Sequence, residues 1–264
     1  MCRIGFSTGA LALGDVCRGV GLVRDTDLRA VELSALRAVE LPGLMQYIKT
    51  ADLSDFDYVS VHAPSAFPSE MEAEIIKQLT PALDKEHHIV VHPDTIYDAR
   101  RWRQFGRFLC VENMDKRKPS GRTAEELSEV FRDLPDASFC LDVGHARQVD
   151  PTMGIAAELI RDFGDRLAQV HMSDVNSSSR HERLNLMASR AFGEISELLS
   201  VEAPVILESP LHSEPESRIR SEIAGEIARA RRALMGLGRA DEDKSPIQRR
   251  PSGKSVPDGS AACL

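Results

Sequence analysis

Short apolar runs rich in β-branched residues recur along the chain, and each is followed by polar residues and then by a helical pattern. The runs predict strands at Ile4–Ser7, Val31–Ser34, Tyr58–His62, Ile89–His92, Phe108–Asn113, Phe139–Val143, Leu167–His171 and Val205–Glu208. Their hydrophobicity is continuous rather than alternating, which is typical of strands covered on both faces in a parallel sheet. Because eight strand–helix units close naturally on themselves, the pattern predicts an α/β fold, a single (β/α)8 TIM barrel.

The segments between the strands predict helices. Apolar residues recur at helical spacing in Glu70–Leu83, Ala124–Leu134, Ala156–Phe163 and Glu194–Leu199. Residues 237–264 mix Gly, Pro, Ser and charges of both signs with almost no apolar periodicity. Such a segment cannot bury enough surface to offset its ordering entropy. We therefore predict one barrel domain over residues 1–236 and a disordered tail over 237–264.

Composition narrows the class of protein. Of the 264 residues, 42% are hydrophobic and 28% are charged, as in a soluble globular protein, and the net charge of −8 argues against binding to nucleic acid through bulk charge. The five cysteines form no CxxC pair, and their odd number fits a reducing compartment. The N-terminus lacks a signal-peptide pattern, and no run approaches the roughly 18 apolar residues of a membrane span. These features predict a cytoplasmic protein that does not enter a membrane.

Six consecutive predicted strands end in a carboxylate or an imidazole. These side chains, in chain order, are His62, His92, Glu112, Asp142, His171 and Glu208, and His145 and His181 follow shortly after two of the strands. The active site of a barrel lies at the carboxyl ends of its strands, so we expect these groups to converge there. Buried carboxylates need a partner, and a metal cation can satisfy several at once.

The order of the strands indicates which of these side chains bind the same ion. Glu112, Asp142, His171 and Glu208 come from four successive strands, and three carboxylates with one imidazole suit manganese, zinc or iron. His62 and His92 flank this group and could bring a second ion, with Glu112 bridging. His145 and His181 could support a third. The cofactor prediction is therefore one to three divalent ions.

Other residues at the predicted mouth suggest how a substrate is held. The loops after the fifth, sixth and seventh strands carry Lys116, Arg117, Arg147 and Arg180, which fit an anionic substrate such as a sugar phosphate or a nucleic-acid backbone. A solvated charged loop explains these cations equally well. Glu32 ends the second strand and is expected either to bond the substrate or to line the mouth.

The strand-end motifs VHAPS, VVHPD, VENMD, LDVGHA, VHMSD and LESP together resemble the xylose isomerase-like barrel superfamily, which includes sugar isomerases and epimerases as well as endonuclease IV. A likeness to the epimerases implies one metal bound by Glu112, Asp142, His171 and Glu208, with Glu112 and Glu208 as acid and base. A likeness to endonuclease IV implies three zinc ions, the third held by His145, His181 and an aspartate two residues before His181. Ser179 occupies that place here, which removes a carboxylate ligand.

Our first hypothesis is that the protein is a metal-dependent isomerase or epimerase, acting on a small sugar-like substrate that could be phosphorylated. The flanking carboxylates would transfer a proton next to a carbonyl. The alternative is an endonuclease IV-like phosphodiesterase, an AP endonuclease acting on nucleic acid, which the scarcity of aromatic residues disfavours. A multinuclear non-haem iron oxygenase and a non-catalytic metal-binding barrel are further alternatives.

Overall fold

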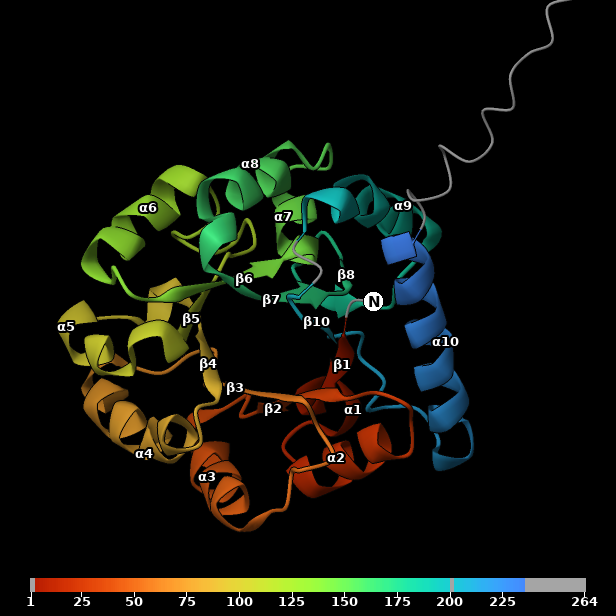
Figure 1. The fold of residues 1–264 in the computed structure, drawn as a ribbon, viewed down its shortest axis with the longest axis horizontal. Helices are drawn as coiled ribbons and strands as arrows, with labels where there is room; N and C mark the ends of the chain where they lie inside the picture. The colour runs from red at the N-terminus through yellow and green to blue at the C-terminus, as the bar shows by residue number, and fades with distance from the viewer. Residues whose placement is uncertain (1–2, 200–201, 236–264) are drawn as a thin grey trace, which may run out of the picture.

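Eight parallel strands form a closed barrel in the computed structural model, which describes residues 3–199 and 202–235 (Figure 1). Around the barrel they follow the order β1-β10-β7-β6-β5-β4-β3-β2. The strands are β1 (Ile4–Ser7), β2 (Ala30–Ser34), β3 (Tyr58–His62), β4 (His88–Val91), β5 (Leu109–Glu112), β6 (Ser138–Asp142), β7 (Leu167–Met172) and β10 (Val205–Leu207). The predicted fold is confirmed. The predicted tail at 237–264 lies outside the described residues.

Helices surround the barrel and cover the outer face of its strands (Figure 1). They are α1 (Thr8–Ala12), α2 (Val16–Arg24), α3 (Leu41–Thr50), α4 (Glu72–Asp84), α5 (Ala99–Trp102), α6 (Ala124–Asp133), α7 (Val143–Val149), α8 (Gly154–Phe163), α9 (Leu186–Ile195) and α10 (Glu216–Met235). Short 3-10 turns lie at η1 (Ala38–Glu40), η2 (Ser69–Met71), η3 (Pro93–Thr95), η4 (Arg103–Phe108), η5 (Gly164–Arg166) and η6 (Ser196–Leu198). None of the helices in the described ranges has the length and apolarity that crossing a membrane requires.

Three of the four predicted helices are present as α4, α6 and α8, whereas the helix predicted at Glu194–Leu199 corresponds to the last two residues of α9 and the 3-10 turn η6. The helix in that region is α9, which begins at Leu186 and ends at Ile195. Asn185 caps its first turn, because the Asn185 side chain accepts a hydrogen bond from the backbone N–H of Ala188 at 2.9 Å. The capping residue, rather than the apolar pattern after it, marks where this helix starts.

A small hairpin extends the loop that follows β7. Its strands, β8 (Asp174–Val175) and β9 (His181–Glu182), pair antiparallel, with Val175 opposite His181. The Ser173 hydroxyl lies 2.7 Å from His181 Nδ1 and holds the ring near the end of β7. The hairpin therefore returns His181 to the carboxyl ends of the barrel strands.

Register within the barrel aligns the strand ends. Glu112 at the end of β5 lies beside Cys140 of β6, and Asp142 at the end of β6 lies beside His171 of β7. Parallel strands with this register place their last residues at one end of the barrel. Below them the interior is packed with residues such as Val90 and Cys110, both fully buried.

Candidate metal centre

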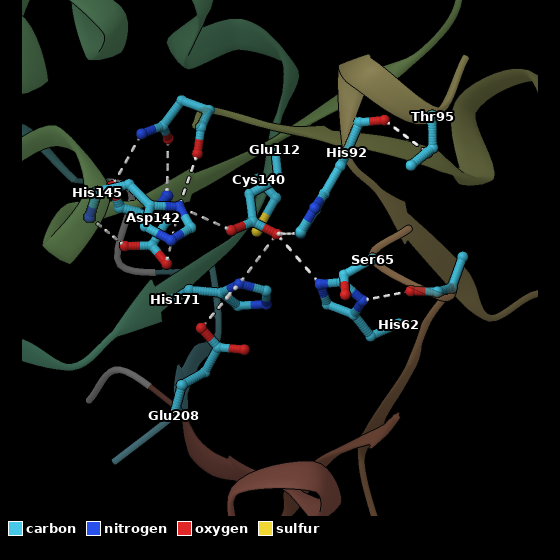
Figure 2. Close-up of polar contacts among 12 residues, drawn as sticks. His62, Ser65, His92, Thr95, Glu112, Cys140, Asp142, His145, His171 and Glu208 are labelled. Atoms are coloured by element: carbon cyan, nitrogen blue, oxygen red, sulfur yellow. Dashed lines mark hydrogen bonds and ion pairs between the residues drawn. The ribbon is translucent and has the colours of Figure 1, made fainter. Parts of the chain in front are cut away.

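Glu112 lies at the centre of a cluster of imidazoles at the carboxyl end of the barrel (Figure 2). Its Oε2 is 3.2 Å from His62 Nε2, 3.6 Å from His92 Nε2 and 3.5 Å from His171 Nδ1. Its Oε1 is 3.2 Å from His145 Nδ1. The Glu112 side chain is 1% exposed. A carboxylate this deeply buried is stable only because cationic or hydrogen-bonding groups surround it.

A four-residue group forms the core of the candidate centre. Glu112, Asp142, His171 and Glu208 each offer a ligand atom, and these atoms lie within 4.8 Å of one another. The residues come from β5, β6 and β7 and from the end of β10, which are neighbours in the barrel. Two buried polar atoms in this group, Asp142 Oδ2 and His171 Nδ1, have no hydrogen-bond partner among the described residues. Leaving such atoms unsatisfied costs about 1–3 kcal/mol each, so the group fits a bound cation.

Two further groups overlap the first. His62, His92 and Glu112 form one, and Asp142, His145 and His181 form the other, again with ligand atoms within 4.8 Å. The structure thus brings together all eight residues that the sequence singled out as candidate ligands. The hydroxyl of Ser179, the residue at the expected aspartate position, accepts a hydrogen bond from Gln148 Nε2 at 2.6 Å. The group of His145 and His181 contains one carboxylate, Asp142, which it shares with the four-residue group.

Sequence reasoning missed one potential ligand. The thiol of Cys140 forms a group with Glu112 and His171 in which all ligand atoms lie within 4.8 Å. The apolar run around Cys140 suggested only a small buried hydrophobe. Cys140 lies two residues before Asp142, and residues i and i+2 of a strand lie on the same face. This spacing indicates that its thiol faces the barrel interior, as Asp142 does.

The carboxylates and imidazoles of the cluster shift one another's pKa values. Burial acts to raise the pKa of Glu112, but the charge of His171 and the hydrogen bonds from His145 and His62 hold it well below its usual range. Burial acts to lower the pKa of His62, yet the hydrogen bond to Glu112 and the charge of Glu32 raise it to about 9. Protons on the imidazoles therefore balance the carboxylate in the metal-free protein. A metal ion must displace such protons, so its affinity rises with pH.

The other members of the cluster differ in their protonation. Burial lowers the pKa of His145, but the charge of Asp142 and the hydrogen bond to Glu112 outweigh it and raise the pKa to about 10. Burial raises the pKa of Glu208, with a smaller contribution from the nearby charge of Glu112. Burial dominates at His92 and lowers its pKa well below the ordinary value.

Backbone contacts hold Asp142 and His145 in place. Asp142 Oδ1 accepts a hydrogen bond from the backbone N–H of His145 at 2.7 Å and so caps the start of α7. Asn113 donates from Nδ2 to the Asp142 carbonyl at 2.9 Å and accepts the Asp142 N–H at 2.8 Å. The capping bond uses Oδ1 of Asp142, whereas Oδ2 makes no hydrogen bond among the described residues and lies 3.4 Å from His145 Nδ1.

The four predicted substrate-binding cations differ in how fully their charges are compensated. Arg147 donates to Asp174 Oδ1 at 2.6 Å, and Arg117 donates to the Ser179 carbonyl at 3.1 Å. Lys116 and Arg180 are exposed, and their side chains form no ion pair within residues 3–199 and 202–235. These two are therefore the cations best able to meet an anionic group.

Comparison with known proteins identifies similar folds. No protein-family model matches the sequence, and no curated protein matches it. Among solved structures, apo 3-keto-D-glucoside 4-epimerase YcjR from E. coli superposes with a TM-score of 0.58 at 14% identity, over 86% of this chain and 100% of that one. A putative sugar phosphate isomerase/epimerase from Anabaena variabilis gives 0.50 at 10% identity, over 84% and 87%.

A third structure, an uncharacterised protein from Parabacteroides distasonis, also has a TM-score of 0.50, at 12% identity over 84% of this chain and 97% of that one. At such low identities the likeness establishes the fold. The resemblance suggested by the strand-end motifs is thus confirmed at the level of the barrel architecture.

Proposed function

We propose that this protein is a divalent-metal-dependent isomerase or epimerase of a small sugar-like substrate. The convergence of Glu112, Asp142, His171 and Glu208 within 4.8 Å carries the proposal, together with the two buried ligand atoms that make no hydrogen bond among the described residues. Three carboxylates and one imidazole make a hard to borderline donor set, which suits manganese, zinc or iron. The shared fold with a sugar epimerase supports the same class of reaction, and the comparisons do not favour the phosphodiesterase alternative.

The placement of the two glutamates fits proton transfer. Glu112 and Glu208 come from the outer two of the four contributing strands, and Asp142 and His171 lie between them. A bound ion would supply positive charge beside the carbonyl and hydroxyl oxygens of the sugar. One glutamate would remove the proton next to the carbonyl and the other would return a proton. Glu208, 13% exposed against 1% for Glu112, is the more accessible to substrate.

The exposed cations provide a place for a negatively charged part of the substrate. Lys116 follows β5, and Arg180 lies in the hairpin that follows β7, so both belong to loops at the carboxyl end of the barrel. Each would contact a phosphate or carboxylate group through charge-assisted hydrogen bonds. Their role concerns binding, so their removal is expected to weaken substrate binding more than turnover.

Deuterium exchange tests the proton transfer directly. Protein loaded with manganese, zinc or iron is incubated in D2O with 3-keto-D-glucosides and sugar phosphates, and NMR records deuterium entering the carbon next to the carbonyl. Glu208→Gln is expected to lower the exchange rate by about 10²–10⁴-fold at saturating metal, because the amide cannot transfer the proton.

Glu182→Gln is the matched control. Glu182 is an exposed glutamate in β9 at the same end of the barrel, so its substitution should leave the rate unchanged. A Glu208→Gln variant that exchanges at the wild-type rate would rule out the proposed proton transfer. Exchange by neither the wild type nor the control variant, with metal bound, would rule out this substrate class.

A further inference from the structure

A second buried carboxylate lies directly beneath the candidate metal centre. Glu32 of β2 is fully buried, and its Oε2 lies 2.9 Å from His171 Nε2, 2.7 Å from Gln169 Nε2 and 3.3 Å from the Ser60 hydroxyl. The sequence had suggested that Glu32 contacts substrate or lines the mouth. In the structure Glu32 does not line the mouth, because its side chain is fully buried and these contacts lie inside the barrel.

The two nitrogens of His171 face different groups. Nε2 faces Glu32, whereas Nδ1 lies 3.5 Å from Glu112 Oε2 and 3.4 Å from Glu208 Oε2. Nδ1 is buried and has no hydrogen-bond partner among the described residues. A neutral imidazole carries its proton on one nitrogen and a lone pair on the other. An ionised Glu32 therefore favours the proton on Nε2 and leaves the Nδ1 lone pair directed at the glutamates.

Neighbouring groups hold one oxygen of the Glu32 carboxylate, Oε2, whereas Oε1 makes no hydrogen bond among the described residues. Gln169 Nε2 is 2.7 Å from Glu32 Oε2 and also 2.7 Å from His171 Nε2. The Tyr58 hydroxyl donates to Gln169 Oε1 at 2.7 Å, which turns the amide nitrogen toward Glu32. An amide nitrogen can only donate, so the 2.7 Å contact between Gln169 Nε2 and a protonated His171 Nε2 is not a hydrogen bond. The negatively charged Oε2 of Glu32 is within reach of both nitrogens and is the acceptor they share.

His62 provides a contrast within the same cluster. Its Nδ1 lies 2.7 Å from the Ala63 carbonyl, and its Nε2 faces Glu112. A backbone carbonyl thus sets the proton on Nδ1 of His62, whereas a carboxylate sets it on Nε2 of His171. The ring nitrogens presented to the centre are therefore opposite in the two residues.

We infer that Glu32 is a positioning residue that fixes the proton of His171 on Nε2 and presents Nδ1 as the metal ligand. The inference rests on the metal centre proposed above. Hydrogen-bond partners of this kind orient ligand imidazoles and raise their basicity, and their loss weakens metal binding by about 10–100-fold. Glu32 contacts neither the substrate nor the ion, and acts on the centre through His171.

Metal affinity and nitrogen NMR test the inference without any assay of activity. Zinc dissociation constants are measured by competition with a chelator. Glu32→Gln, which preserves shape but loses charge, is expected to bind zinc about 10–100-fold more weakly. Ser60→Ala removes another partner of Glu32 but leaves His171 in contact with it, so its affinity should stay within about threefold of wild type.

The wild-type protein supplies a test that needs no variant. In the zinc-loaded protein, labelled with ¹⁵N at histidine, the spectrum should show His171 bound through Nδ1 and protonated at Nε2. Binding through Nε2 would overturn the inference, as would wild-type affinity in a folded Glu32→Gln variant. Failure of the wild type itself to bind zinc, manganese or iron would instead overturn the proposed metal centre, and the inference with it.

Discussion

At the scale of single residues, His92 differs from the other candidate ligands in what its second ring nitrogen faces. Nε2 of His92 is 3.6 Å from Glu112, while Nδ1 is 3.5 Å from the Lys118 ammonium, which also donates to Asp94 at 2.7 Å. A ligand histidine ordinarily donates its other N–H to an acceptor. An ammonium opposite Nδ1 disfavours that proton position, so the group of His62, His92 and Glu112 should hold an ion less tightly than the four-residue group.

Replacing Lys118 tests this difference between the groups. Lys118→Gln removes the charge and offers an acceptor to Nδ1, so a second zinc ion should bind roughly tenfold more tightly. Lys118→Arg keeps the charge and should leave the second binding step as it is in the wild type. Calorimetric titration of the metal-free protein with zinc resolves the two steps. An unchanged second step in Lys118→Gln would show that the ammonium does not control this group.

At the scale of elements, the start of α7 joins the barrel to the candidate centre. Asp142 ends β6 and caps α7, and Gly144 lies in the first turn of that helix. A Cβ atom at Gly144 would lie 2.6 Å from the Ser173 carbonyl oxygen and 2.8 Å from Val175 Cγ2. Only glycine therefore allows the first turn of α7 to approach the end of β7 so closely. This contact fixes the positions of both Asp142 and His145.

Gly144→Ala should consequently affect both folding and metal binding. Crowding against the β7 backbone is expected to lower the free energy of unfolding by about 1–3 kcal/mol, and zinc affinity should fall because Asp142 and His145 shift. Gly21→Ala in α2 is the matched control: nothing lies within 4 Å of its added Cβ, so it should be neutral or stabilising by up to about 1 kcal/mol. Urea unfolding and zinc titration measure the two effects. Wild-type stability and affinity in Gly144→Ala would contradict the role assigned to this contact.

The elements also show which parts of the fold are encoded locally. Each predicted strand is present with bounds within one residue, because continuous apolar runs are a local signal. The start of α9 escaped prediction because Leu186 and Met187 are 73% and 64% exposed, so the apolar residues there do not mark a buried face. Helix α10 was not predicted, although its sequence indicates a helix. Ile219, Ile223 and Ile227 recur at helical spacing, and all three are buried.

At the scale of the whole molecule, the candidate centre is assembled by contacts between residues far apart in the chain. The strand-end rule anticipated that the eight candidate ligands converge, because barrel topology places all strand ends together. It could not anticipate Glu32, which meets His171 across 139 positions of sequence and depends on the ring orientation of that histidine. The lining of the mouth is predictable from sequence, whereas the hydrogen bonds beneath it require the packed barrel.

Elemental analysis of the untagged, purified protein, with His171→Ala as the comparison, tests the proposed metal centre by measuring its metal content per chain. We predict at least one manganese, zinc or iron ion per wild-type chain, and a marked loss in the variant. Adding that metal to a metal-free sample at 100 times its dissociation constant should stabilise the fold by about 2.7 kcal/mol. A wild-type protein that contains no such ion, and binds none on reconstitution, would show that the cluster around Glu112 is not a metal centre.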